Sequence, residues 1–441
     1  MKKALLGLFI IIVICAISAP FVNGLILENI LRSQVEKYNE LYAEHSFYPD
    51  IEITNYHRSY GSSEIEWTMT VPYLQTLDDV GPIVLVEKAQ HGVFGITSTT
   101  HLNRNSGYSD FIRENLNGED PLSISSRYGL FRGLTTTIAL EQLELHDDEN
   151  NSMIVNPGEL VIRADRSLAN IRTDATFAGI SVPGAFEIKG IELHSNIKLI
   201  SRLIVDGTSS VSIEQINIED RDAVAISSLK GESTFDFDEA NNKLSMQAKY
   251  SVAQIVADDN KVDDVRISFG INQLDVAGFE AVYAVYTNLI NDLLANVATT
   301  QNDPERAKEM MEKEMALAGI RLVAEAEKLL KKDLQIEISN LHLVLPQGVV
   351  VGDLSIGLKQ DMTMVSFISL SQQPKKLVEV FSFASNMSLP VGLIPNQDNL
   401  LSPIFPGMQT GLFEEVGGKL VHKAEITDHQ LLLNGKEFQL R

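Results

Sequence analysis

An N-terminal apolar run constrains this chain more than any other feature of its sequence. Ala4–Leu27 holds 24 successive residues without a charge. At 1.5 Å per residue, a helix of that length crosses a hydrocarbon core of about 30 Å. Lys2 and Lys3 precede the run and Glu28 follows it. Because positive charge stays on the cytoplasmic side, the run predicts one transmembrane signal anchor (1–27) in a bacterial inner membrane, with the bulk of the chain in the periplasm.

Two alternative interpretations of this run are a cleaved signal peptide and a lipoprotein signal. Cleavage after Ser18 or Gly24 is sterically feasible, whereas Pro20 blocks cleavage after Ala19. The run outlasts the apolar core of about 7–15 residues in cleaved signal peptides, which favours an uncleaved anchor. A lipoprotein signal needs a small residue before its cysteine, but an isoleucine precedes Cys15.

The composition excludes several classes of partner and site. Hydrophobic residues make up 44% and charged residues 22% of the 441 residues, as in globular proteins, and the net charge is −23. Such an acidic surface would repel a phosphate backbone, so no nucleic-acid partner is expected. Cys15 is the single cysteine, so neither an intrachain disulfide nor a cysteine-based metal site can form.

Alternating apolar and polar residues dominate the region 46–277. Ile65–Val71 is a clear example, and Lys243–Val256 and Val265–Val276 are longer ones. Period-two segments that are bounded by Gly, Pro, Asn or Asp turns are typical of antiparallel strands with one buried face. The region is therefore predicted to be β-rich.

Helical spacing of apolar residues appears in two places. The segment 28–45 is predicted to be a juxtamembrane helix that continues from the anchor. The segment 278–332 is predicted to be a helical hairpin, in which Asp303 caps the second helix and Pro304 occupies its first position. These two helices are expected to cover one face or one end of the sheet.

The C-terminal region 333–441 is predicted to be β-rich with short helices. Thr363–Leu370 is interpreted as a strand, and short apolar helices are expected around Lys376–Met387 and Gly407–Val416. The whole chain therefore predicts an α+β, mainly β fold: a long curved antiparallel meandering sheet with two to four covering helices and one N-terminal transmembrane helix.

One local pattern recurs, a polar pair followed by apolar, polar and apolar residues. It begins at Glu141, Lys189, Glu214, Asn272 and Ser339, without a fixed period that would indicate a solenoid. Two interpretations are left open: an ordinary half-buried strand, or a row of stacked hairpins in a long curved sheet.

No catalytic, cofactor-binding or metal-binding residue is predicted. The nine histidines show no ligand spacing such as H-E-x-x-H, and the acidic clusters lack the glycine and closing glutamate of a calcium loop. Hydrolase elbow, Walker A and dinucleotide motifs are absent from the sequence. The chain is therefore expected not to be an enzyme and to need no cofactor.

A proline-containing segment near the C-terminus is the candidate partner-binding or lipid-facing flap, although a buried core loop explains it equally well. Its apolar residues are Leu389, Val391, Leu393, Ile394, Leu400, Leu401, Ile404 and Phe405.

Several motifs resemble the YdgA-like family of uncharacterised, signal-anchored periplasmic proteins. They are the two N-terminal lysines with a single span, a strand ending in His91-Gly92 (where Val93 replaces the proline of that family), a strand entering Pro346-Gln347-Gly348, and the terminal Asn434-Gly435-Lys436. The resemblance implies a β-rich periplasmic domain without known catalytic residues. The strand pattern is more weakly similar to AsmA-type envelope proteins, whose anchored sheets are thought to conduct lipids.

The leading hypothesis is a non-enzymatic binding or scaffold protein of the cell envelope, anchored in the inner membrane, with a lipid or protein partner in a groove of the sheet. One alternative is an envelope-polymer hydrolase that uses two carboxylates from separate strands. Another is a structural homo-oligomer.

Overall fold

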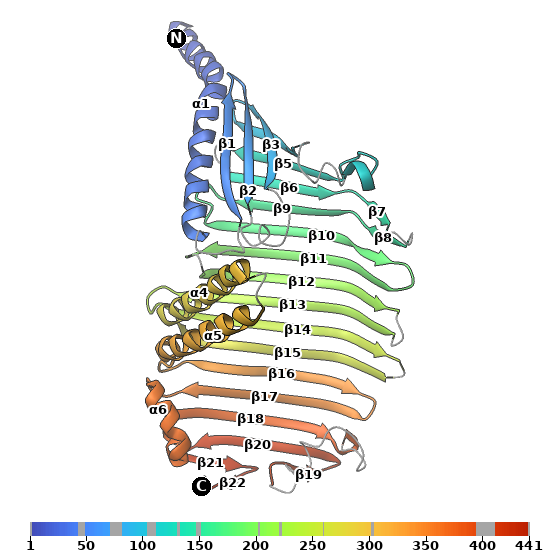
Figure 1. Cartoon of the computed structure of the whole chain (residues 1–441), viewed down its shortest axis with the longest axis vertical. Helices are drawn as coiled ribbons and strands as arrows, with labels where there is room; N and C mark the ends of the chain where they lie inside the picture. Colours follow the sequence, from blue (N-terminus) through green and yellow to red (C-terminus); the bar gives the residue numbers. More distant parts are fainter. Residues whose placement is uncertain are drawn as a thin grey trace. The chain divides into compact units, whose positions relative to one another are not determined.

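The computed structural model describes residues 2–42, 49–70, 82–103, 112–129, 133–146, 151–201, 203–219, 223–258, 260–300, 304–393 and 411–439. Its described residues form 22 strands and a few helices, and the paired strands run antiparallel, mostly between neighbours in sequence (Figure 1). The prediction of a mainly β, meandering antiparallel fold is confirmed. The chain divides into two compact units, which are described separately.

Unit 1 comprises residues 1–183, 193–202 and 290–307. Its strands pair in the order β1-β2-β3-β4-β5-β6-β9-β10, and the β7–β8 hairpin joins the end of β10 through β8. The elements are α1 (Lys2–Tyr42), β1 (Asp50–Arg58), β2 (Ser62–Thr70), β3 (Ile83–His91), β4 (Gly95–Leu102), β5 (Leu122–Gly129), β6 (Gly133–Leu140), β7 (Leu143–His146), β8 (Ser152–Val155), β9 (Gly158–Ala164) and β10 (Asn170–Val182).

Helix α1 is one uninterrupted helix that packs on the first strands of unit 1. It contains both the predicted anchor and most of the predicted juxtamembrane helix, so no break occurs at residue 27. Leu27 and Leu31 of α1 form a core with Ile65, Ala89 and Ile96 from β2, β3 and β4. Among helices whose side chains the structure describes, which in α1 begin at Ser18, none has the combined length and apolarity of a membrane span.

Unit 2 comprises residues 184–192, 203–289 and 308–441. Its strands pair in chain order from β12 to β18, then with β20, β21 and β22, while β19 pairs with β20. Strand β11 (Phe186–Leu199) is divided between the units. The others are β12 (Val205–Ile218), β13 (Val224–Asp238), β14 (Lys243–Ala257), β15 (Asn260–Asp275), β16 (Gln335–Leu345), β17 (Gly348–Leu358), β18 (Phe381–Pro390), β19 (Glu414–Val416), β20 (Lys419–Thr427), β21 (Gln430–Leu433) and β22 (Lys436–Glu437).

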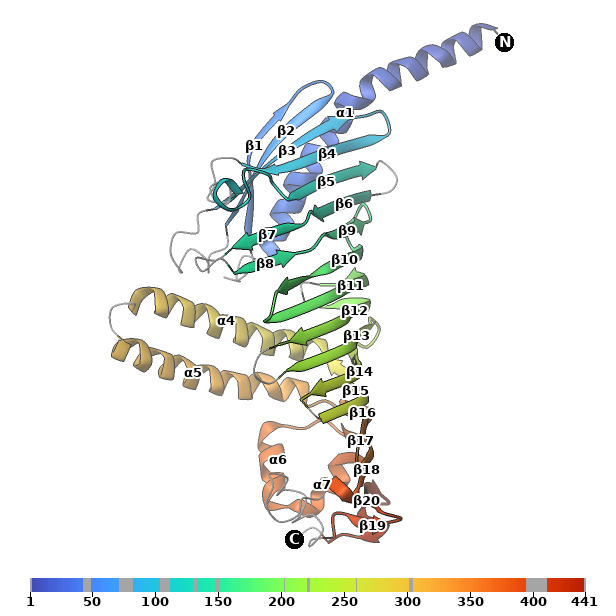
Figure 2. The same cartoon turned by 90° about the vertical axis from the view of Figure 1, so that its right-hand side faces the viewer.

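The helices occur at two connections between strands. The predicted hairpin consists of α4 and α5, which link β15 to β16. The parts of both helices that belong to unit 2 project away from the strands of that unit (Figure 2). Short helices link β17 to β18, and one follows β18. The bounds are α4 (Val276–Thr300), α5 (Pro304–Ala326), η1 (Glu327–Leu329), α6 (Met364–Ser369), η2 (Leu370–Gln372), η3 (Pro374–Lys376), α7 (Leu377–Val380) and η4 (Val391–Leu393).

Three C-terminal segments differ from their predicted structure. Thr363–Leu370 is not a strand, because Thr363 caps α6 through a reciprocal capping box with Ser366. The predicted helix at Lys376–Met387 is mostly strand β18, in which alternate side chains point to opposite faces. Within the predicted helix at Gly407–Val416, the described residues include strand β19 instead, and 407–410 lie outside the described residues.

The recurring polar pair marks local irregularities of the strands. Gly190, Gln273 and Asn340, each the second residue of a pair, have φ values of 61°, 58° and 53°. The register shifts between Leu244 and Met246 opposite the second of these, and between Ile338 and Leu341 at the third. Such β-bulges bend a strand and increase its local twist. The pattern is thus more specific than that of an ordinary half-buried strand.

Candidate functional site

One face of the sheet in unit 2 carries a continuous cross-strand row of apolar residues, here called the apolar face. Directly opposed residues on neighbouring strands put their side chains on the same face, so the register defines the row. From β13 to β18 it consists of Phe235, Met246, Ile271, Ile336, Ile356 and Phe383, and the opposed pair Ile426 and Leu431 continues it on β20 and β21.

The opposite face of the same strands is mainly polar. The adjacent cross-strand row runs through Gln247, Gly270, Glu337, Ser355, Ala384 and Glu425. Because successive side chains of a strand alternate between faces, this row points away from the apolar face. The sheet of unit 2 is therefore two-sided.

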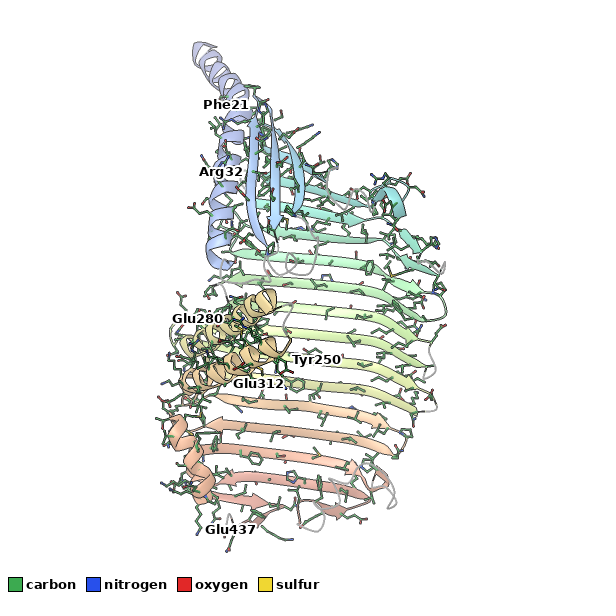
Figure 3. The ribbon with its side chains drawn as sticks, in the orientation of Figure 1. Phe21, Arg32, Tyr250, Glu280, Glu312 and Glu437 are labelled. Carbon is green, nitrogen blue, oxygen red and sulfur yellow. The ribbon has the colours of Figure 1, made fainter. Side chains whose placement is uncertain are left out.

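The apolar face is exposed in part and hollowed at its C-terminal strands. Ile336 is 50% exposed, and Phe269 packs edge-on against Tyr250, which Figure 3 labels. One hollow of about 520 Å³ lies between β17, β18, β20, β21 and the segment α6–α7, lined by Ile356, Phe367, Leu370, Leu377, Phe381, Phe383, Ile426 and Leu431.

A second hollow adjoins the first. Its volume is about 460 Å³, and it shares Phe383 and Leu431 with the first hollow. Both volumes fall within the range of about 300–1,000 Å³ that is typical of small-molecule sites. We call the two hollows together the apolar groove.

A few polar groups line the second hollow. His422 and Ser385 place Nε2 and Oγ 3.2 Å apart, and Nδ1 of His422 lies 2.9 Å from the carbonyl oxygen of Leu412. The ring of Phe413 packs at 5.6 Å from the imidazole. The groove thus combines a large apolar lining with a small polar group at one end, a composition that is common in binding sites for apolar ligands.

The predicted flap residues do not line this groove where they are described. Leu389 is buried in β18, and Val391 and Leu393 are half-buried in η4. Ile394, Leu400, Leu401, Ile404 and Phe405 lie outside the described residues.

The motif Pro346-Gln347-Gly348 forms the turn between β16 and β17, next to the start of the predicted flap. Gly348 has φ 133°, and a Cβ atom there would lie 2.8 Å from Cγ of Pro390. A side chain at this position would therefore clash as well as strain the backbone. The structure thus packs the motif Pro346-Gln347-Gly348 against the start of the predicted flap.

The motif Asn434-Gly435-Lys436 closes the last hairpin. The Oδ1 atom of Asn434 accepts a 2.8 Å hydrogen bond from the backbone of Lys423, and its Nδ2 donates to the carbonyl of Gly411. Nζ of Lys436 lies 2.7 Å from Oε1 of Glu414. These residues fasten the segment before β20 to the terminal hairpin.

The motif His91-Gly92 lies where α1 packs against the first strands of unit 1. The Nδ2 atom of Asn23 donates a 2.6 Å hydrogen bond to the carbonyl of Gly92, and Asn23 is only 3% exposed. Nε2 of His91 lies 2.9 Å from Oγ of Ser63, and burial lowers the pKa of this imidazole. A Cβ atom on Gly24 would lie 2.4 Å from Cε1 of His91, so only glycine allows this approach.

A buried carboxylate continues this polar layer beneath α1. Glu87 accepts hydrogen bonds from Nε1 of Trp67 at 3.0 Å and from the hydroxyl of Tyr128 at 3.1 Å. Burial, together with the adjacent carboxylate, raises the pKa of Tyr128 well above its usual value. A cavity of about 260 Å³ beside this cluster lies between α1 and the strands. The cluster satisfies these buried polar groups across β2, β3 and β5, and Trp67 and Tyr128 also pack against the core that contains Leu27 and Leu31 of α1.

The clear pKa shifts of carboxyl groups among the described residues are all downward. Asp174 is one of two carboxyl groups whose pKa is lowered to about 2, in its case by a hydrogen bond with His194, followed by contacts with Arg172 and Arg163. A general acid at neutral pH needs a raised pKa instead. Within the described part of the chain, no three His, Cys, Asp or Glu side chains group closely enough to hold a metal ion.

The groove residues were not predicted from the sequence. Ile356, Phe383, Ile426 and Leu431 stand on four strands separated by turns and helices, and the register alone brings them together. The available signal was the presence of large apolar residues on the alternating positions of successive strands.

Comparison with protein families gives a match over residues 1–441 to a bacterial protein family of unknown function, DUF945. No curated protein and no solved structure matches this chain.

Proposed function

This chain belongs to the DUF945 family of bacterial proteins, and we propose that it is a membrane-anchored periplasmic protein that binds the acyl chains of a lipid in the apolar groove of unit 2. In this role the protein acts by binding and needs no catalytic residue. The observation that carries the proposal is the pair of adjoining apolar hollows that share Phe383 and Leu431.

The lining of the groove favours an acyl chain over a peptide. A peptide brings backbone N–H and C=O groups that must keep hydrogen-bond partners when they leave water. Peptides that bind a sheet usually pair with an exposed edge strand, whereas β17, β18 and β20 are paired on both sides. An acyl chain has no polar groups to satisfy and gains about 25 cal/mol for each Å² of apolar surface removed from water.

The N-terminal segment supports a location beside a membrane. The apolar run that begins at Ala4 has no charge, and α1 carries it without a break into the core of unit 1. A source of lipid would thus be permanently close to the protein. The YdgA-like resemblance agrees with this proposal, and so does the weaker similarity to AsmA-type proteins.

Lipid extraction tests the proposal directly. Full-length protein purified in detergent is extracted with organic solvent, and the extract is analysed by mass spectrometry against a detergent-only control. A stoichiometric phospholipid or fatty acid is expected. A protein that carries no lipid, and that takes up none from mixed micelles, would contradict acyl-chain binding.

One observation favours a second candidate, the structural homo-oligomer. Helix α5 exposes five large apolar side chains, and exposed apolar patches often mark protein interfaces. They are Met311, Met315, Leu317, Ile320 and Val323. Crosslinking in native membranes would give a discrete dimer band if these residues face a second copy. The hydrolase alternative has no comparable support among the described carboxylates, whose resolved pKa shifts are downward.

A further inference from the structure

We infer that two hairpin tips of unit 1, the turn of β1–β2 and the turn of β3–β4, lie in the headgroup layer of the membrane beside the point where α1 enters the bilayer. This inference rests on the proposed anchor and adds a second contact between the protein and the lipid. We call Tyr60, Val93 and Phe94, together with Phe21 and Val22 of α1, the interfacial patch.

Hydrogen bonds hold the two tips against α1. Asn23 donates through Nδ2 to the carbonyls of Gly92 and Val93, at 2.6 and 3.4 Å. The backbone N–H of His91 donates to the carbonyl of Gly61 at 2.8 Å, which joins the tip of β3–β4 to the tip of β1–β2. Both tips therefore stay beside the turn of α1 that contains Asn23.

The patch exposes large apolar side chains around the helix. Phe94 is 83% exposed and Tyr60 is 56% exposed, and Val93, Phe21 and Val22 are also exposed. Figure 3 labels Phe21 where α1 passes the ends of these strands. Tyrosine and tryptophan are enriched at membrane–water interfaces because they have an apolar body and a polar tip, as Tyr60 has, whereas Phe94 and Phe21 contribute apolar surface.

The length of the apolar run sets the depth of the patch. Asn23 is hydrogen-bonded to the turn of β3–β4, so only the 19 residues of Ala4–Val22 remain to cross the bilayer. At 1.5 Å per residue they span ~28 Å, which is close to the hydrocarbon thickness of ~30 Å. The hydrocarbon boundary must then reach Val22, and this places the tips bonded to Asn23 at the same level.

The charges near the patch are compatible with a lipid surface. Glu28 is paired with Arg58 at 3.2 Å and with Arg32 at 3.3 Å, which reduces the repulsion between its carboxylate and anionic headgroups. The guanidinium of Arg58 also lies over the ring of Phe21, 5.3 Å from its centroid. Arginine beside an aromatic ring suits the boundary between headgroups and acyl chains.

A polarity-sensitive dye tests the inference. The full-length chain with Cys15→Ala receives either Phe94→Cys or, as a control, Glu119→Cys, and each single thiol is labelled with NBD. Glu119 is exposed and lies just before the start of β5. The other end of β5, at Gly129, pairs with Gly95 beside the tip of β3–β4, so Glu119 is remote from that tip. Both proteins are placed in vesicles of phosphatidylethanolamine and phosphatidylglycerol, with and without doxyl-labelled lipid. Trp67, the sole tryptophan, reports whether unit 1 is folded.

At position 94 the NBD emission is expected to shift to shorter wavelength and to be quenched by doxyl lipid, whereas at position 119 it should remain as in water. A carbonate wash distinguishes failure of the patch inference from failure of the proposed membrane anchor. If the protein stays with the vesicles but the dye at position 94 emits as in water, the patch inference is wrong and the anchor stands. If carbonate releases the protein, both are wrong.

Discussion

The side-chain amide of Asn23 in α1 donates a 2.6 Å hydrogen bond to the backbone carbonyl of Gly92, 69 residues further along the chain. This bond lies in a buried layer that also contains His91 and Ser63. The N-terminal helix and the first strands therefore form one folded unit, so a break in the chain after Gly24 would separate Asn23 from its partner.

Replacing Asn23 by alanine should destabilise unit 1. Asn23→Ala removes the buried donor of this bond, and a hydrogen bond contributes about 0.5–1.5 kcal/mol to stability. Asn29→Ala is the matched control, because Asn29 is exposed on the same helix. Urea unfolding followed by Trp67 fluorescence measures both, and equal midpoints for the two variants would contradict the assigned role of Asn23.

Gly24→Ala should also destabilise unit 1, although alanine favours a helix. The new Cβ would lie 2.4 Å from Cε1 of His91, which is buried and cannot move away freely. Overpacking of this kind costs about 1–3 kcal/mol. In α5, by contrast, nothing lies near a Cβ placed on Gly319, so Gly319→Ala should stabilise its helix by about 0.5–1 kcal/mol. Thermal unfolding of both variants should therefore show shifts of opposite sign.

Asp174 should titrate near pH 2. Its hydrogen bond with His194 is the largest of the causes that lower the pKa of its carboxyl from 3.8 to about 2. Because the folded pKa lies below the unfolded one, the contribution of Asp174 to stability is complete above about 3.8 and is lost as the pH falls towards 2. Carbon-detected NMR should place the midpoint near 2, and His194→Ala should move it upward. A midpoint near 3.8 in the unmodified protein would refute the assignment.

The long strands could be predicted because each of them alternates over many residues. Strands β13 to β15 carry this period without interruption by proline, and their ends fall at Asn or Asp turns. The strand prediction for Thr363–Leu370 is wrong because its apolar residues suit a strand locally, whereas the capping box at Thr363 starts a helix.

The candidate site was less predictable than the strands. The sequence predicted a binding flap whose apolar residues begin with Leu389, but Leu389 is buried and much of the flap lies outside the described residues. The groove depends on which residues oppose one another across β17, β18, β20 and β21, and a shift of one residue would move each side chain to the other face. This register could not be predicted from a single sequence. The sequence indicates His91-Gly92 through its place directly after a strand and through the family resemblance, but its contact with Asn23 joins segments that no local pattern connects.

Photo-crosslinking in membranes tests the central proposal most directly. Full-length protein is expressed with a photoactivatable phospholipid, irradiated, and digested so that adducts can be mapped to peptides. Ile356→Asn alters the apolar groove, and Val351→Asn is the matched control, since Val351 lies on the opposite face of the same strand with 41% exposure against 37% for Ile356. Burial of an isoleucine side chain stabilises by about 1.5–3 kcal/mol, so its loss should reduce binding about 10-fold or more.

Acyl-chain binding predicts adducts on the peptides that contain Ile356, Phe383 and Leu431. These adducts should fall in Ile356→Asn and remain in Val351→Asn, while labelling of the N-terminal run stays constant in both. Labelling confined to the N-terminal run, or groove adducts that are equal in the two variants, would contradict the proposal.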